Sequence, residues 1–256
     1  NENSLGFSFY FYRLKYWTIK LNNMNSIISP LIRECIYCGT PLLKRKESVK
    51  IAETTKRFPD NGETKDHIPQ RCLFEGYSEE YKKNRFTVPS CHKCNFEFSQ
   101  VEQELRDLIG IANENGGLQK KITENSVQSI LNHSNSSARL RKDSLGYVRG
   151  VEFNLDTLMP SHIKNFKGVF YKTYGVRVPD YFLISVLDTN VNSNFESLAI
   201  TFLDKHVDWQ FSGHEDIFKY KISLIKPDNK GILICSKNIE ESVGVLCQLR
   251  YHIRFN

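Results

Sequence analysis

The sequence has no uninterrupted apolar run of about eighteen residues, the length that a membrane-spanning helix needs. We therefore expect neither a membrane span nor a membrane partner. The sequence also lacks internal repeats, low-complexity tracts and coiled-coil heptads. What remains is a chain of 256 residues with 40% hydrophobic and 25% charged residues. That composition is ordinary for a soluble globular protein, and the length allows one large domain or two small ones.

A complete disulfide framework needs an even number of cysteines, and this sequence has seven. Four of them form two Cys-x2-Cys pairs, a pattern of metal sites in a reducing compartment. We therefore expect a cytoplasmic protein. The other three cysteines are expected to be small buried hydrophobic side chains, namely Cys72, Cys235 and Cys247.

Residues 1–23 do not have the features of a signal peptide, because Arg13 and Lys15 interrupt the apolar run and no small-residue cleavage site follows. The segment is rich in aromatic residues and asparagine. It can be interpreted as a strand packed on the body, as part of an incomplete upstream region or as a translation artefact. We assign it no function.

The net charge of +6 is distributed unevenly along the chain. Residues 1–150 contain 23 Lys and Arg against 17 Asp and Glu, whereas residues 151–256 contain 12 of each. Residues 44–57 alone carry six basic and two acidic side chains. Basic surface attracts phosphate, so a polyanion partner is one explanation and a solvated surface of mixed charge is the other. For residues 44–57 the alternatives are a solvated hairpin or loop and a phosphate-contacting surface.

Hydrophobic periodicity and turn residues predict an α+β protein. Short strands are expected at residues 64–68 and 86–88. They are followed by a helix beyond Cys94 that breaks or restarts at a possible capping box, Ser99-x-x-Glu102. Two further helices are predicted at residues 118–131 and 160–174. Five short strands should follow, at residues 181–187, 198–203, 208–211, 218–225 and 231–236, and then a last strand or helix at residues 242–255.

The two Cys-x2-Cys pairs have the pattern of a structural zinc site. Thiolates are soft ligands, and a tetrahedral set of four suits Zn²⁺. The pairs are separated by 52 residues, far more than in a simple zinc finger. The zinc should therefore hold together a small subdomain whose functional part lies inside this interval. The predicted ligands are Cys35, Cys38, Cys91 and Cys94.

The interval contains the dipeptide Asp66-His67, and Asn95 follows the second cysteine pair directly. Asp66 and His67 are adjacent in a predicted strand, so their side chains should point to opposite faces. A carboxylate and an amide oxygen are hard ligands that suit Mg²⁺. A neutral imidazole can accept a proton from water at neutral pH. These residues predict a second metal site with a general base beside it.

These motifs together resemble one nuclease family. The chain reads Asp66-His-Ile-Pro-Gln-Arg-Cys-Leu-Phe74 and Thr87-Val-Pro-Ser-Cys-His-Lys-Cys-Asn95 between and across its cysteine pairs. This order resembles the HNH endonucleases of the ββα-metal type, in the form that carries a zinc knuckle. The resemblance covers roughly residues 33 to 110. A weaker likeness extends to the segment that begins Lys164-Asn-Phe-Lys-Gly168.

The resemblance implies a role for each site residue. His67 would be the general base, Asp66 and Asn95 would hold a catalytic Mg²⁺ or Mn²⁺, and Asn84 would orient the loop that carries His67. The substrate would be nucleic acid, most plausibly double-stranded DNA, and cutting of both strands would often require a homodimer. The family serves in restriction, mobile elements or defence in bacteria.

The resemblance and the pattern of predicted helices and strands together divide the chain into four parts. Residues 1–23 are an N-terminal extension of unknown role, and residues 24–112 form the HNH module with its zinc knuckle. Residues 113–175 are a helical segment, and residues 176–256 form a β-rich C-terminal domain whose role the sequence does not indicate.

Two other functions are compatible with the same sequence. One is a zinc-knuckle module that binds nucleic acid without cutting it, although such a module has no need of Asp66, His67 and Asn95 together. The other is a zinc-stabilised interaction scaffold with a solvated basic surface. The nuclease and the binding module both predict a DNA affinity that falls as the salt concentration rises, whereas the scaffold predicts no such DNA binding.

Overall fold

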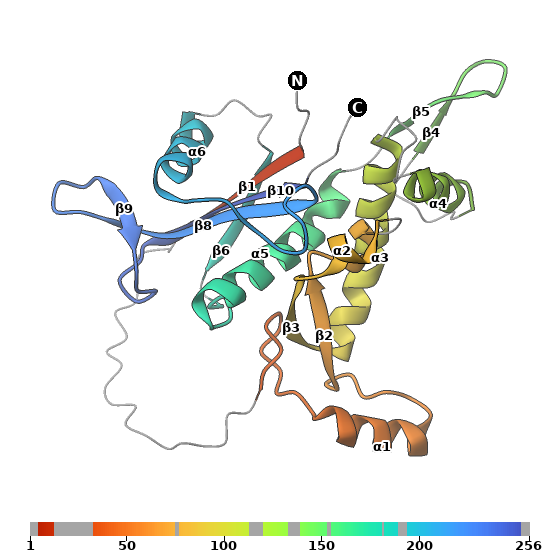
Figure 1. The fold of residues 1–256 in the computed structure, drawn as a ribbon, viewed down its shortest axis with the longest axis horizontal. Helices are drawn as coiled ribbons and strands as arrows, with labels where there is room; N and C mark the ends of the chain where they lie inside the picture. The colour runs from red at the N-terminus through yellow and green to blue at the C-terminus, as the bar shows by residue number, and fades with distance from the viewer. Residues whose placement is uncertain are drawn as a thin grey trace.

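The structure is a computed structural model that describes residues 5–12, 33–74, 77–112, 120–132, 139–152, 155–180, 182–188 and 194–251. Helices and strands are mixed, so the α+β prediction is confirmed. A hairpin with helices around it forms one side of the molecule and an antiparallel sheet forms the other, with α5 (Met159–Tyr174) between them (Figure 1).

The hairpin consists of β2 (Glu63–Ile68) and β3 (Phe86–Cys91), and α3 (His92–Ala112) follows β3 without a break. The strands are antiparallel, with Asp66 opposite Val88. A 3-10 turn, η1 (Arg71–Phe74), and the short α2 (Glu79–Lys82) lie in the connection. The predicted break near Ser99 is wrong. The Ser99 hydroxyl donates to the carbonyl oxygen of Phe96 inside the helix, at 2.6 Å, and therefore caps no new helix.

The basic run at residues 44–57 is a helix, α1 (Arg45–Thr55), so the predicted hairpin or loop is wrong. Lys, Arg, Glu and Ala all favour helix, and they make up nine of the 14 residues of the run. The helix ends at Lys56, whose left-handed backbone (φ 60°) lets its N–H bond to the carbonyl of Ala52. Its other side chains are largely exposed, but Ser48 is buried against the hairpin side.

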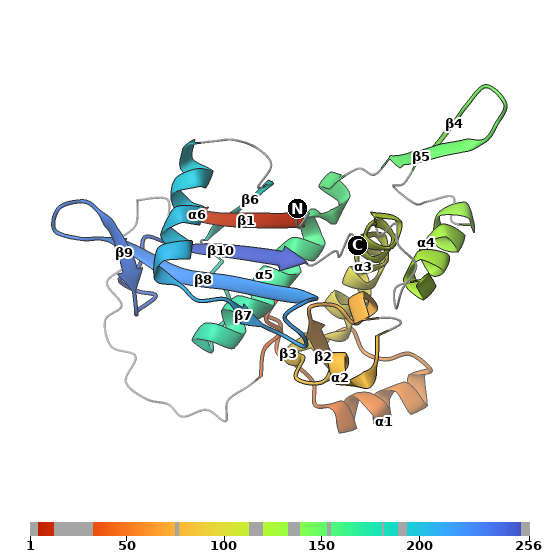
Figure 2. The ribbon, with the colours of Figure 1, turned by 45° about the horizontal axis from the view of Figure 1, so that its top comes forward.

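The sheet has the strand order β6-β1-β10-β8-β7, with β9 paired to the far end of β8 (Figure 2). Residues 5–12 belong to it, so the strand interpretation of the N-terminal segment holds for this part. The remainder of residues 1–23 lies outside the described residues. Every pairing in the sheet is antiparallel. Its strands are β1 (Leu5–Tyr12), β6 (Leu183–Asp188), β7 (Gln210–Phe211), β8 (Phe218–Pro227), β9 (Leu233–Ser236) and β10 (Gly244–Tyr251).

One predicted strand of the C-terminal part is instead a helix. Residues 198–203 lie within α6 (Asn194–His206). Ala199 and Leu203, four residues apart, are buried against Ile225 and Leu246 of the sheet, whereas Leu198 is 69% exposed. Burial at every fourth residue is the pattern of a helix. The apolar surface of the sheet favours the helix because it buries this side of α6.

The remaining elements include the predicted helices. They are α4 (Lys120–Asn132), η2 (Leu155–Leu158) and α5 (Met159–Tyr174), together with a hairpin of β4 (Arg139–Lys142) and β5 (Val148–Glu152). α5 ends at Gly175, whose φ of 73° suits glycine. None of the described helices combines the length and the apolar character that a membrane crossing requires.

The main hydrophobic core joins the two sides of the molecule. Apolar side chains of α5 pack on the sheet through β8 and β10 and on the hairpin through Ile68. All seven cysteines are free. Cys247 is buried in this core as predicted, but Cys72 is only partly buried and Cys235 is exposed, so for these two the prediction of burial is wrong. Cys235 lies on β9, which pairs with only one strand.

Candidate functional site

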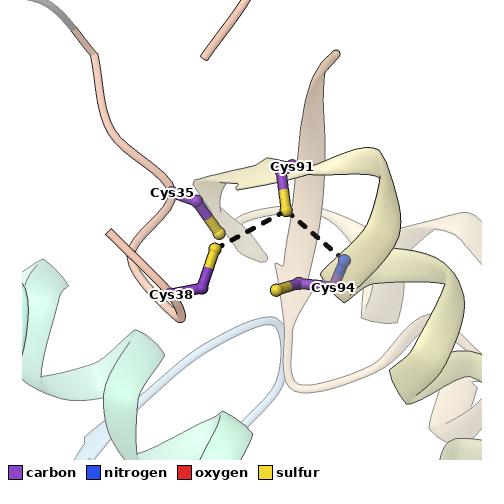
Figure 3. Close-up of side chains that lie close together, drawn as sticks. All are labelled: Cys35, Cys38, Cys91 and Cys94. Atoms are coloured by element: carbon purple, nitrogen blue, oxygen red, sulfur yellow. Dashed lines mark hydrogen bonds between the residues drawn. The ribbon is translucent and has the colours of Figure 1, made fainter. Parts of the chain in front are cut away.

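The four predicted zinc ligands meet at one point (Figure 3). Their sulfur atoms all lie within 4.8 Å of one another. Cys35 and Cys38 come from the turn before α1, Cys91 ends β3, and Cys94 lies in the first turn of α3. Three of the four are buried, and Cys38 is exposed. Four sulfurs at this spacing suit the tetrahedral coordination of zinc.

The local backbone explains why the sulfurs converge. Gly39, with φ 73°, turns the chain so that its N–H bonds to the carbonyl of Cys35 at 2.8 Å. The N–H of Ile36 reaches the carbonyl of Pro89 at 3.2 Å, which holds the first knuckle beside β3. The N–H of Cys94 donates to the sulfur of Cys91 at 3.4 Å, as the start of a helix allows.

The cluster favours negative charge on one sulfur in the absence of a metal. A hydrogen bond from Cys94 lowers the pKa of the Cys35 thiol to about 4. Burial raises the pKa of Cys91 to about 11, and the same Cys94–Cys35 bond raises the pKa of Cys94. Buried thiolates this close repel one another, so only a cation can hold several of them ionised. Zinc binding would therefore release protons.

Asp66 lies on the face of β2 that α3 and α5 cover, and it is 5% exposed. Its Oδ1 atom is 2.9 Å from Nζ of Lys164 in α5, and its Oδ2 atom accepts a hydrogen bond of 2.6 Å from the hydroxyl of Tyr37. Both carboxylate oxygens therefore have partners. Burial raises the pKa of Tyr37, and the Asp66 charge raises it further, so the phenol keeps its proton for this bond.

Lys164 is fully buried and also bonds to Glu102 of α3. Burial alone would lower the pKa of Lys164, but the charges of Asp66 and Glu102 outweigh it and raise that pKa. Burial raises the pKa of Glu102, and Lys164 offsets only part of this effect. Two carboxylates and one ammonium leave one negative charge in excess, so this buried group attracts a further proton or cation.

Asn95 is near the same face of β2. Its Nδ2 atom donates to the hydroxyl of Thr64 at 3.3 Å, and Thr64 is two residues before Asp66 in the strand. Asp66 and Asn95 are therefore neighbours, and their oxygen atoms are the ligand types that a hard divalent ion prefers. The ligand chemistry and the excess negative charge fit such an ion. An ion held by Asp66 would have to replace the contact with Lys164.

His67 points to the opposite face of β2 and is partly buried. Burial lowers its pKa, and the positive charge of Arg85 lowers it further, with a smaller effect of Arg71. The imidazole is therefore neutral at pH 7, as a general base must be. Arg85 stacks 4.8 Å from the Phe74 ring, and its Nη1 atom is buried without a hydrogen-bond partner.

Asn84 is exposed, and its side chain makes no hydrogen bond to Asp66, His67 or Asn95 within the described residues. Its backbone is left-handed, with φ 63°, a conformation that asparagine tolerates better than most residues. It turns the chain from α2 into β3, in which Thr87 pairs with His67. Asn84 therefore lies in the turn before β3, three residues before Thr87, the residue that pairs with His67.

α5 is tied to the chain just after His67 by buried side chains. Gln70 donates to the hydroxyl of Ser161 at 2.9 Å and accepts from the amide of Asn165 at 2.9 Å. Asn165 also donates to the hydroxyl of Tyr251 in β10, at 2.7 Å. One helix therefore links the Asp66-His67 strand to the last strand of the sheet, and it carries Lys164 between these contacts.

Several residues of this site could not be assigned from the sequence. Lys164 appeared only within the weaker likeness, and Glu102 was interpreted as a capping residue. Tyr37, Arg71 and Arg85 carried no motif of their own. The helix at residues 160–174 contains three lysines, Lys164, Lys167 and Lys172, and only the structure shows that Lys164 is the buried one.

No protein-family model, curated protein or solved structure matches this chain. The site is therefore interpreted from its own residues and geometry, and the resemblance to HNH endonucleases stays a prediction.

Proposed function

We propose that this protein is an HNH-type endonuclease that hydrolyses phosphodiester bonds in DNA. The observation that carries the proposal is the β2–β3 hairpin running directly into α3, with Asp66, His67 and Asn95 on these elements and four cysteines at their base. An antiparallel hairpin followed by a packed helix is the arrangement that the ββα-metal name describes.

His67 would act on the attacking water. Its imidazole is neutral at pH 7 because burial and Arg85 lower its pKa, and it remains partly accessible. It can therefore accept a proton as the water attacks phosphorus. Cleavage should lose rate only below pH 6.5, where the imidazole takes up a proton.

Asp66 and Asn95 would hold the divalent ion, Mg²⁺ or Mn²⁺. When bound, the ion supplies charge stabilisation for the transition state and for the departing 3′ oxygen. Thr64 fixes the amide of Asn95, and Tyr37 fixes one oxygen of Asp66. Lys164 would give up its contact with Asp66 and keep Glu102, to which it is also bonded.

Arg85 and Arg71 would meet the negative charge of the substrate. Both raise the positive potential at His67, and Nη1 of Arg85 makes no hydrogen bond within the described residues. A guanidinium binds phosphate oxygens well because its N–H groups match their geometry.

The test is a cleavage assay on supercoiled plasmid with Mg²⁺ or Mn²⁺. It compares the wild type with His67→Ala and with a control, His206→Ala, which changes an exposed histidine on α6. Zinc content and far-UV spectra establish that all three are folded. We expect the wild type and the control to nick or linearise the plasmid and His67→Ala to lose this activity. Equal cleavage by all three would overturn the assignment of His67.

A second candidate is a zinc-knuckle module that binds nucleic acid without cutting it. The observation in its favour is that Lys164 and Tyr37 already satisfy both oxygens of a buried Asp66. This candidate predicts salt-dependent DNA binding and no cleavage by any of the three proteins with either metal.

A further inference from the structure

Three cationic side chains surround one tryptophan on the face of the sheet that points away from α5. Lys219 and Lys221 of β8 lie 5.2 and 4.9 Å from the centre of the Trp209 ring, and Arg250 of β10 lies 4.8 Å from it. We call these four residues the Trp209 cluster. α6 covers the same face further along, over Ile225 and Leu246 (Figure 2).

The Trp209 cluster has more positive charge than its surroundings neutralise. Lys221 is buried and pairs with Asp204 of α6 at 2.6 Å. Lys219 and Arg250 are partly exposed and pair with none of the described carboxylates. The Nε atom of Arg250 is buried without a hydrogen-bond partner. Three cations and one carboxylate leave two positive charges in excess.

This excess does not reflect the composition of the C-terminal part, since residues 151–256 carry equal numbers of basic and acidic side chains. Like charges around one ring repel one another, and a cation–π contact offsets only about 0.5–2 kcal/mol each. An anion bound at the cluster would remove the repulsion and satisfy the free N–H of Arg250. The arrangement is therefore that of an anion-binding surface.

The Trp209 cluster lies beside the strand that carries His67. The hydroxyl of Ser212 donates to the carbonyl of Ile68 and accepts from the N–H of Phe86 at 3.2 Å. Trp209 is three residues before Ser212, and three residues span at most about 11 Å. Gly213, which follows Ser212, packs against the side chain of Arg85. A polyanion at His67 and Arg85 therefore passes close to the cluster.

We propose that the Trp209 cluster binds backbone phosphates of double-stranded DNA next to the cleavage site, which gives the C-terminal sheet a role. The proposal rests on the proposed function for its choice of substrate. The cations lie over the ring, so Trp209 orders them.

The test measures binding of a short fluorescein-labelled duplex by anisotropy, in buffer without Mg²⁺ or Mn²⁺ so that no cleavage occurs, and zinc content is checked afterwards. The variants are Lys219→Gln, Arg250→Gln and their double. The control, Lys230→Gln, removes the same charge from the exposed turn at the other end of β8. The series runs from about 50 to about 200 mM salt.

We expect each single variant to bind several-fold more weakly than the control and to reduce the salt slope by about 1, and the double to reduce it by about 2. Trp209→Leu should weaken binding too, because the cations lose the ring that orders them. Affinity and slope of the double variant equal to those of Lys230→Gln would overturn the proposal. The proposal would also be overturned if the wild type bound the matching single strand more tightly than the duplex and Trp209→Leu abolished this preference.

The two proposals fail separately. His67→Ala should keep the affinity and slope of the wild type while losing cleavage. Normal cleavage with unchanged DNA binding in the double variant would refute the Trp209 cluster alone. Equal cleavage by His67→Ala, together with weak binding in the double variant, would refute the catalytic assignment alone.

Discussion

Lys164 of α5 and Asp66 of β2 form an ion pair of 2.9 Å in which neither side chain is open to solvent. The lysine occupies a place beside the aspartate where the proposed function needs a metal ion. Glu102 also bonds to this lysine, so one ammonium serves two carboxylates. Strand β2 is thereby fastened to a helix that also supports the sheet.

Lys164→Met should destabilise the protein by about 3–5 kcal/mol, because it leaves two buried carboxylates without a cation. Glu102→Gln added to Lys164→Met should recover part of this loss by removing one of the two charges. Urea unfolding measures the free energies. The control is Lys172→Met, on the same helix, whose ammonium lies 5.8 Å from the centre of the Phe86 ring. If Lys164→Met and Lys172→Met lowered the free energy of unfolding by the same small amount, the buried ion pair would not contribute to stability.

The four-cysteine cluster should bind one zinc ion per chain, and Cys94→Ser should lose it. The binding free energy of a structural zinc, about 10–16 kcal/mol in small zinc-finger peptides, is comparable to the whole stability of a domain. Loss of zinc should therefore unfold the hairpin side of the molecule. Metal analysis and thermal unfolding measure both effects. Cys235→Ser changes an exposed cysteine of β9 and should keep the zinc. A wild type that contains no metal and stays folded would contradict the assignment.

Gly168→Ala should destabilise the contact between α5 and β2. A Cβ atom at this position would lie 2.4 Å from Cγ1 of Ile68, a fully buried side chain. Overpacking of this kind costs about 1–3 kcal/mol, whereas alanine in a helix gains at most about 1 kcal/mol over glycine. We expect a net loss of roughly 1 kcal/mol or more in chemical unfolding. Gly150→Ala, where the added atom meets nothing within 4 Å, should show no such loss.

His162 should make the protein sensitive to acid. It is 2% exposed, and burial lowers its pKa to about 3. Between pH 6.5 and about 3 the unfolded chain binds a proton at this histidine and the folded chain does not. The free energy of unfolding is therefore not reduced by this histidine above pH 6.5. As the pH falls below 6.5, this histidine lowers the free energy of unfolding by about 1.4 kcal/mol per pH unit.

The measurement compares urea unfolding of the wild type and His162→Gln between pH 6.5 and about 5. The variant should show a slope that is smaller by about one proton, even if its stability at neutral pH is lower. The comparison of slopes cancels the contribution of zinc loss, which both proteins share. His206→Gln, on the exposed end of α6, should keep the wild-type slope. Identical slopes for all three would refute the prediction.

The parts of the fold that local signals determine were predictable. The cysteine spacing predicted a cluster that the structure brings together, and the Asp66-His67 strand and the helix that ends at Gly175 are present. In each case the information lies within a few residues, such as a Cys-x2-Cys turn or a glycine that ends a helix. The order of two strands followed by a helix, which are β2, β3 and α3, followed from these signals.

The parts that distant contacts determine were not predictable. Residues 198–203 have the apolar character of a strand, and only Ile225 and Leu246 show which side must be buried. Glu102 fits a capping box in sequence, but its carboxylate bonds to a lysine far along the chain. The positive charge at Trp209 comes from two strands, β8 and β10, that are far apart in the sequence, and the overall charge balance does not reveal it.

The place of β1 in the sheet has a consequence for synthesis. Leu5 pairs with Tyr251, so the first described strand lies between β6 and β10 and binds to the last described strand. A ribosome delivers β1 long before β10. The sheet therefore cannot close until β10 has emerged, and the long loop to be closed makes this pairing slow. Until then the edges of β1 and β8 that pair with β10 are exposed to other chains, and a chaperone could protect them during this period.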